Sequence, residues 1–172
     1  MGETGQEASL LWQAEAISGF ARSELFDRTF QEGMELVEET AAYLDGAGRQ
    51  DSKLLSRNAA LAYAAESMRL TTRLMQVASW LLVQRAVREG DMAPESALDA
   101  SYRLGAEADP DGAAAAEKLP TPLCELLGRS ERLFERVKHL DSRMYADGAL
   151  EAAAGPHPVL AQMERLKDAF GA

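Results

Sequence analysis

The sequence has a single cysteine, Cys124, which excludes an intrachain disulfide and a cysteine-based zinc site. Aromatic residues make up only 6% of the chain, which favours helices packed through small and medium side chains over a β-sandwich. No apolar run approaches the ~18 residues needed to cross a bilayer. Basic residues are fewer than acidic ones. The formal net charge of -10 argues against binding to the phosphate backbone of a nucleic acid. We therefore expect an all-α, cytoplasmic protein with no membrane partner and no direct nucleic-acid partner.

Recognisable catalytic and cofactor motifs are also missing. Neither His139 nor His157 has a glutamate three residues before it, which a di-iron helical bundle would require. The sequence contains no His-Glu-x-x-His pair, no Walker loop and no Gly-x-Ser-x-Gly turn. Cys124 lies among leucines at the start of a predicted helix, so we expect a buried, inert thiol rather than a reactive one. These absences predict a protein that is not an enzyme and that has no cofactor and no metal site.

The most informative segment that is present is Ser52–Glu89, which contains neither glycine nor proline. It is typical of one continuous helix, roughly 55 Å long, so we expect an elongated molecule. Apolar and small residues alternate along it at spacings of four and three, which indicates a coiled-coil-like seam. Met68 and Met75 lie in this seam and are expected in the core. The seam comprises Leu61, Ala65, Met68, Thr72, Met75, Ser79, Leu82 and Ala86.

Apolar stripes at helical spacing predict two further long helices. The first spans residues 23–45, with Ser23 as its N-cap and Gly46 just past its end. The other spans residues 121–145 and opens with a threonine followed by a proline. A short helix is expected at 94–104.

These helices should form an elongated antiparallel three-helix bundle over residues 21–146, because the connection between the first two is short. Residues 1–20 carry no sustained period and are expected to be a flexible N-terminal tail. Residues 147–172 contain two prolines and are expected to be a flexible C-terminal tail. A short amphipathic segment at 159–170 would bind a partner or fold back onto the bundle. Its apolar residues are Val159, Leu160, Met163, Leu166 and Phe170.

A second apolar row runs beside the seam of the long helix. Three helices can hardly cover a helix that is apolar around most of its circumference. We therefore expect a homodimer, with this second row as a candidate dimer or partner face. The row comprises Tyr63, Leu70, Leu74, Val77, Trp80 and Leu81.

Charge is unevenly distributed along the chain. Residues 1–45 carry ten acidic and two basic side chains, whereas residues 52–89 carry two acidic and six basic ones. This distribution favours ion pairs between the long helix and its acidic neighbours over a basic strip that binds a partner.

The block Glu35–Gly90 reads ELVEETAAYLDGAGRQ and then, after a short gap, LSRNAALAYAAESMRLTTRLMQVASWLLVQRAVREG. It resembles the regulator of CtrA degradation family, an alphaproteobacterial group also described as a domain of unknown function. The resemblance covers the first two predicted helices, and the segment ESMRLTTRLMQVASWLLVQRAVREG is its most specific part.

The resemblance implies a small helical dimer that works as a non-enzymatic adaptor for the ClpXP protease in cell-cycle-timed proteolysis. Its implied partners are ClpXP primed by a response-regulator-type protein, and protein cargo such as CtrA-type regulators. Recruitment to a cell pole is a further implication, and no catalytic residue is carried over. The alternative is a dimeric interaction module that binds a response regulator or transcription factor without any protease.

Overall fold

The computed structural model describes residues 3–106 and 118–153, and every regular element in those ranges is helical. The prediction of an all-α protein is therefore confirmed for the described residues. The α-helices are α1 (Glu3–Ala21), α2 (Glu24–Asp45), α3 (Ala47–Lys53), α4 (Arg57–Glu89) and α5 (Thr121–Ala153). Two 3-10 turns, η1 (Ser96–Leu98) and η2 (Ala100–Tyr102), follow α4.

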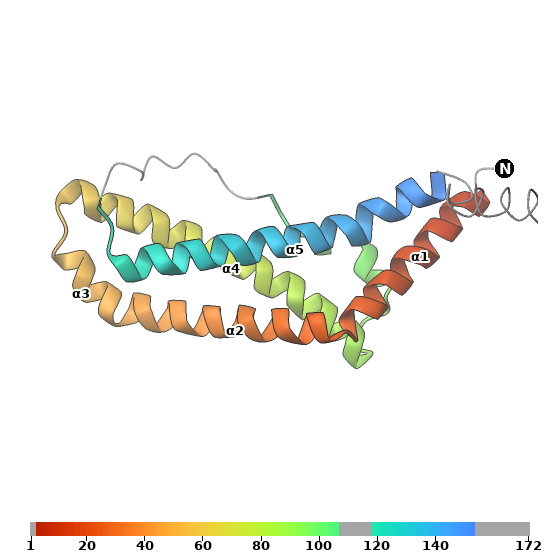
Figure 1. Cartoon of the computed structure of the whole chain (residues 1–172), viewed down its shortest axis with the longest axis horizontal. Coiled ribbons are helices and arrows are strands. Elements are labelled where there is room, and N and C mark those ends of the chain that lie inside the picture. The colour runs from red at the N-terminus through yellow and green to blue at the C-terminus, as the bar shows by residue number, and fades with distance from the viewer. Residues whose placement is uncertain (1–2, 107–117, 154–172) are drawn as a thin grey trace, which may run out of the picture.

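Helices α2, α4 and α5 run lengthwise in an elongated body (Figure 1). Helix α2 runs opposite to α4 and α5, and it contacts both of them. Helix α1 leans against one end of this body, where it packs on α4 and on the later turns of α5. The chain reverses direction between α2 and α4, where the short helix α3 (Ala47–Lys53) lies (Figure 1).

Helix α1 corrects the prediction that residues 1–20 form a flexible tail. Its residues Ala14, Ile17 and Ala21 are buried at positions that share one helix face. Phe20 packs against Phe26 and Trp80, with ring centroids 5.7 Å and 5.6 Å apart. The bundle therefore has four long helices rather than three. The apolar pattern of α1 was hard to recognise in the sequence because two of these three buried residues are alanines.

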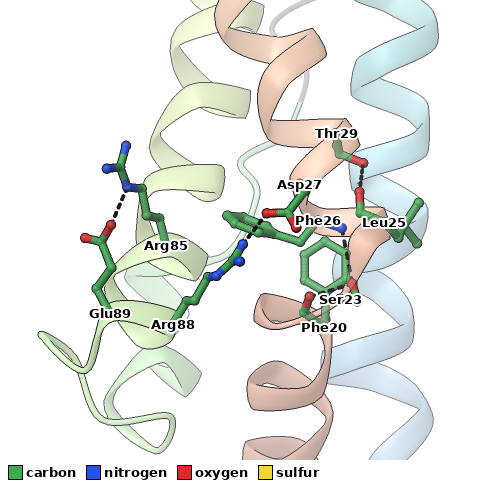
Figure 2. Close-up of polar contacts among 9 residues, drawn as sticks. All are labelled: Phe20, Ser23, Leu25, Phe26, Asp27, Thr29, Arg85, Arg88 and Glu89. Atoms are coloured by element: carbon green, nitrogen blue, oxygen red, sulfur yellow. Dashed lines mark hydrogen bonds and ion pairs between the residues drawn. The ribbon is translucent and has the colours of Figure 1, made fainter.

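Helix α2 begins and ends close to the predicted residues. The Ser23 Oγ accepts a hydrogen bond from the backbone N–H of Phe26 at 3.1 Å, which caps the helix start (Figure 2). Phe26 points into the core, whereas Asp27 reaches the Arg88 guanidinium of α4 (Figure 2). The capping residue and the apolar stripe were both readable in the sequence.

The predicted helix at 52–89 is wrong at its start, because it is divided in two. Helix α3 fills the region expected to be a loop and ends at Lys53, and α4 begins at Arg57. The break occurs because Ser56 has extended backbone, and its Oγ accepts from the Ala59 N–H at 3.2 Å. A local cap therefore outcompetes helix continuation here.

The segment after α4 is pinned to the bundle by a buried carboxylate. Gly90 ends α4 in the left-handed conformation, with φ of 81°. Asp141 of α5 then accepts hydrogen bonds from the Leu104 N–H at 3.2 Å and the Arg103 guanidinium at 2.9 Å. Because of these contacts, the helix expected at 94–104 is replaced by the turns η1 and η2.

Helix α5 continues to Ala153, past the predicted end at 145. The proposed tail at 147–172 is thus wrong for its first residues, and the rest of that tail lies outside the described residues. Cys124 is exposed rather than buried, because the three leucines around it point to other faces of the helix. The expectation of a buried thiol was therefore wrong.

Candidate interaction surface on α4

Helix α4 has two apolar faces, and the structure reverses the roles predicted for them. The row expected to be a dimer or partner face lies in the core of the protomer: five of its six side chains are at most 4% exposed, and the sixth, Tyr63, is half-buried. It therefore offers no surface to a partner. The five buried residues are Leu70, Leu74, Val77, Trp80 and Leu81.

The predicted seam faces solvent instead. Its four large residues are exposed by 65% at Leu61, 72% at Met68, 65% at Met75 and 51% at Leu82. They recur every seventh residue, two helical turns apart, and so follow one side of α4. We call Leu61, Met68, Met75 and Leu82 the α4 stripe. The expectation that Met68 and Met75 are core residues was wrong.

The residues between the members of the α4 stripe are small and uncharged. Ala65, Thr72 and Ser79 are exposed along the same side of the helix. At a rise of ~1.5 Å per residue, the stripe is about 30 Å long. Small side chains between large ones let a second helix approach closely, as in coiled coils.

Two hollows border the α4 stripe, one on each side of Met75. One lies between α2 and α4, has a volume of about 280 Å³ and is lined by apolar side chains that include Val37 and Leu74. The other, of about 510 Å³, lies between α4 and the η2 region and includes Ser79 and Tyr102. Met75 is therefore a ridge between two depressions that a partner's side chains could fill.

Buried polar contacts fix the rotation of α4 that turns the stripe outward. The Trp80 Nε1–H donates to the Asp141 carboxylate at 3.0 Å. The Arg73 guanidinium, buried in the interface with α5, donates to the Ser130 Oγ at 2.9 Å. Removing the Asp141 carboxylate would leave the buried Trp80 Nε1–H unpaired, which costs about 1–3 kcal/mol.

Titratable groups with shifted pKa values lie away from the stripe, at structural contacts. Burial raises the pKa of Tyr145 to about 12, and its Oη donates to the Ala97 carbonyl at 2.7 Å. Burial and a hydrogen bond to Asp51 raise the pKa of Tyr43 above its ordinary value. These groups stabilise the connections between helices and do not form a reactive cluster.

No group of three or more potential metal-binding side chains occurs among residues 5–106 and 118–145, whose side chains the structure describes. In the same part of the chain, each helix is too short or too polar to cross a membrane. The predicted partner-binding tail residues cannot be placed, because they lie outside the described residues. They are Val159, Leu160, Met163, Leu166 and Phe170.

Two signals in the sequence could have identified the exposed face of α4. Trp80 belongs to the second row, and a tryptophan in a helical protein of this size is usually largely buried. The seam, by contrast, alternates large residues with Ala65, Thr72 and Ser79, which bury little apolar area. A comparison of the apolar volume of the two rows would have placed the second row, which contains Trp80, in the core.

Comparisons with known proteins agree on one family. Residues 17–170 match the protein family of unknown function DUF1465. The chain is also similar to a crystal structure described as RcdA from Caulobacter crescentus CB15, with 71% sequence identity and a TM-score of 0.63. That similarity covers 74% of this chain and 97% of the RcdA chain. A search of curated proteins finds no match. The chain therefore belongs to the DUF1465 family, in which it is similar to RcdA, a regulator of CtrA degradation.

Proposed function

We propose that this protein is a non-enzymatic adaptor that delivers CtrA-type response regulators or other cargo to the ClpXP protease. The observation that carries the proposal is the 71% identity to RcdA over nearly the whole length of that chain. Its implied partners are protein cargo and ClpXP primed by a response-regulator-type protein. The described residues support a role in binding, since they offer an apolar docking surface.

The adaptor works as a homodimer, and the α4 stripe is its interface. A period of seven residues allows two copies of α4 to pack against each other along their whole length. The stripe and the small residues between its members carry no charge, although the chain has a net charge of -10. Two copies would therefore meet where like-charge repulsion is smallest.

The C-terminal residues supply the second contact that an adaptor needs. When a rigid body binds one partner and a tethered motif binds another, each partner is held at a high effective concentration near the other. In this proposal the body is the dimer of helical bundles and the motif is the segment at 159–170. Its apolar residues would act as helix-in-groove anchors on the partner.

The proposal is tested by the degradation of purified CtrA-type regulators by ClpXP and its priming protein, with and without this chain. Addition of the chain is expected to accelerate degradation. Deleting residues 154–172, which leaves α5 whole, should keep the helical content and abolish the acceleration. Binding of a regulator without any change in its degradation rate would instead favour a protease-independent interaction module.

A further inference from the structure

A second exposed apolar surface lies on α1, at one end of the molecule (Figure 1). Leu11 is 63% exposed and Trp12 is 37% exposed. Ala8 and Glu15 are exposed as well, and each of them is three or four positions from both Leu11 and Trp12. Residues at these spacings are neighbours on a helix surface, so the four side chains form one contiguous area. We call Ala8, Leu11, Trp12 and Glu15 the α1 patch.

The other side of α1 is fixed to the bundle, which gives the α1 patch a rigid support. Ala14, Ile17 and Ala21 are buried there. The Gln13 side-chain amide donates to the Tyr145 carbonyl of α5 at 2.8 Å. A tryptophan on a fixed helix loses little conformational freedom when a partner binds, and tryptophan is one of the residue types that most often dominate a protein interface.

Negative charge borders the apolar side chains of the α1 patch. Glu7 lies four residues before Leu11 and Glu15 lies four residues after it, so both carboxylates are neighbours of this leucine. Both are exposed, and neither has an ion-pair partner among residues 5–106 and 118–145, the ranges in which side chains are described. Helix α1 contains three glutamates and no lysine or arginine.

This combination of charge and apolar surface fits a basic, apolar protein segment. A lysine or arginine can lie over the face of an exposed tryptophan while it also approaches a nearby carboxylate. The formal net charge of the chain is -10, so the overall charge favours the same partner as the local charge. An anionic membrane surface and the phosphate backbone of a nucleic acid would both be repelled.

We propose that the α1 patch docks a basic, apolar segment of another protein. Trp12 is the anchor of this contact, and Glu7 and Glu15 bind the lysine or arginine side chains of the segment. The family match begins at residue 17, so the α1 patch lies before it. The proposal does not depend on the adaptor role, because binding is measured without any protease or cargo.

The test is the binding of a model peptide to the full-length chain, measured by fluorescence anisotropy. The probe is a fluorescein-labelled amphipathic peptide with leucines at helical spacings of three and four and with lysines beside them. A control peptide has glutamate in place of each lysine. The lysine peptide is expected to bind about tenfold more tightly than the glutamate peptide. Equal affinities, or no binding of the lysine peptide, would overturn the proposal.

Two single substitutions assign the contact to the α1 patch. Trp12→Ala should weaken binding of the lysine peptide by about tenfold or more, because it removes the anchor. Leu54→Ala should leave the affinity unchanged, because Leu54 is an 86% exposed leucine in the α3–α4 connection. Equal losses in the two variants would mean that the peptide binds any exposed apolar residue, and the assignment would fail. Circular dichroism checks that both variants keep their helices.

A charge reversal tests the two carboxylates separately from the apolar residues. The double variant Glu7→Lys, Glu15→Lys should reduce the advantage of the lysine peptide over the glutamate peptide by about tenfold. An unchanged advantage would refute the role of these carboxylates. Vesicles of phosphatidylcholine and phosphatidylglycerol test the other kind of partner. Vesicle binding that requires Trp12, without binding of the lysine peptide, would replace the protein segment with a lipid surface.

Discussion

Gly48 is the residue at which α3 approaches the side chains of its neighbours most closely. A Cβ at this position would lie 2.5 Å from the Tyr63 hydroxyl and 2.8 Å from the Tyr43 carbonyl oxygen. Gly48→Ala is therefore expected to lower the free energy of unfolding by about 1–3 kcal/mol, through overpacking. Urea denaturation measures this change.

Gly19 offers a matched control within the same chain. It lies in α1, and a Cβ added there would meet nothing within 4 Å. Gly19→Ala should raise the free energy of unfolding by about 0.5–1 kcal/mol, because alanine loses less backbone entropy on entering a helix. Equal effects of the two substitutions would show that Gly48 is not at a close contact.

Tyr145 makes stability depend on alkaline pH. Its pKa rises from 10.0 to about 12 on folding, chiefly through burial. Above pH 10 the unfolded chain therefore loses the phenol proton while the folded chain keeps it, so the stabilisation present below pH 10 is lost toward pH 12. The loss should approach about 1.4 kcal/mol per pH unit.

The contribution of Tyr145 is isolated by comparing the wild type with Tyr145→Phe in urea denaturation at pH values on both sides of 10. At neutral pH the variant should be less stable by about 1 kcal/mol, because the hydrogen bond to the Ala97 carbonyl is lost. This difference should shrink as the pH rises. A constant difference across the range would contradict the assignment. Tyr102→Phe serves as the control at an exposed tyrosine.

At the scale of the elements, α1 is the part of the fold with the weakest sequence signal. Ile17 is fully buried in the core, whereas Leu11 on the same helix is 63% exposed. Ile17→Ala should cost about 2–5 kcal/mol in the free energy of unfolding, and Leu11→Ala less than about 0.5 kcal/mol. Thermal or urea denaturation of the two variants measures both changes. Similar small effects would mean that α1 does not pack on the bundle.

The sequence predicted elements best where a cap and an apolar stripe coincided, as at α2 and at the start of α5. It failed where local chemistry competed with a continuing pattern, as at Ser56. Its side chain caps a new helix within a segment that has no glycine or proline to mark a break. It also failed at η1 and η2, since the contacts of Asp141 with Arg103 and Leu104 join residues far apart in the chain. Such long-range hydrogen bonds leave no local pattern.

The candidate surface was harder to predict than the helix that carries it. Period and composition identified both apolar rows of α4, but which row faces the core depends on how α2 and α5 pack around it. The contact between Trp80 and Asp141 settles that choice, and it joins residues on different helices. The resemblance to the family, in contrast, was readable from the sequence alone.

At the scale of the whole molecule, charge guides assembly more than it stabilises the bundle. Helix α2 pairs with α4 through Asp27 and Arg88, and with α5 through Glu39 and Arg129. All four side chains are substantially exposed, so each pair contributes at most about 1 kcal/mol. The expected pairing of the long helix with its acidic neighbours is thus seen at Arg88, while other acids of α2 pair with α5. The α4 stripe is left as an uncharged surface.

The most direct test of the α4 stripe is the molar mass of the protein by light scattering across a wide range of concentrations. We predict a dimer for the wild type and for Leu54→Glu, and a folded monomer for the double variant Met68→Glu, Met75→Glu. The double variant should keep its helical circular dichroism, because both methionines are solvent-exposed. A wild-type monomer at every concentration, or a dimer that survives the double substitution, would show that the α4 stripe is not a dimer interface.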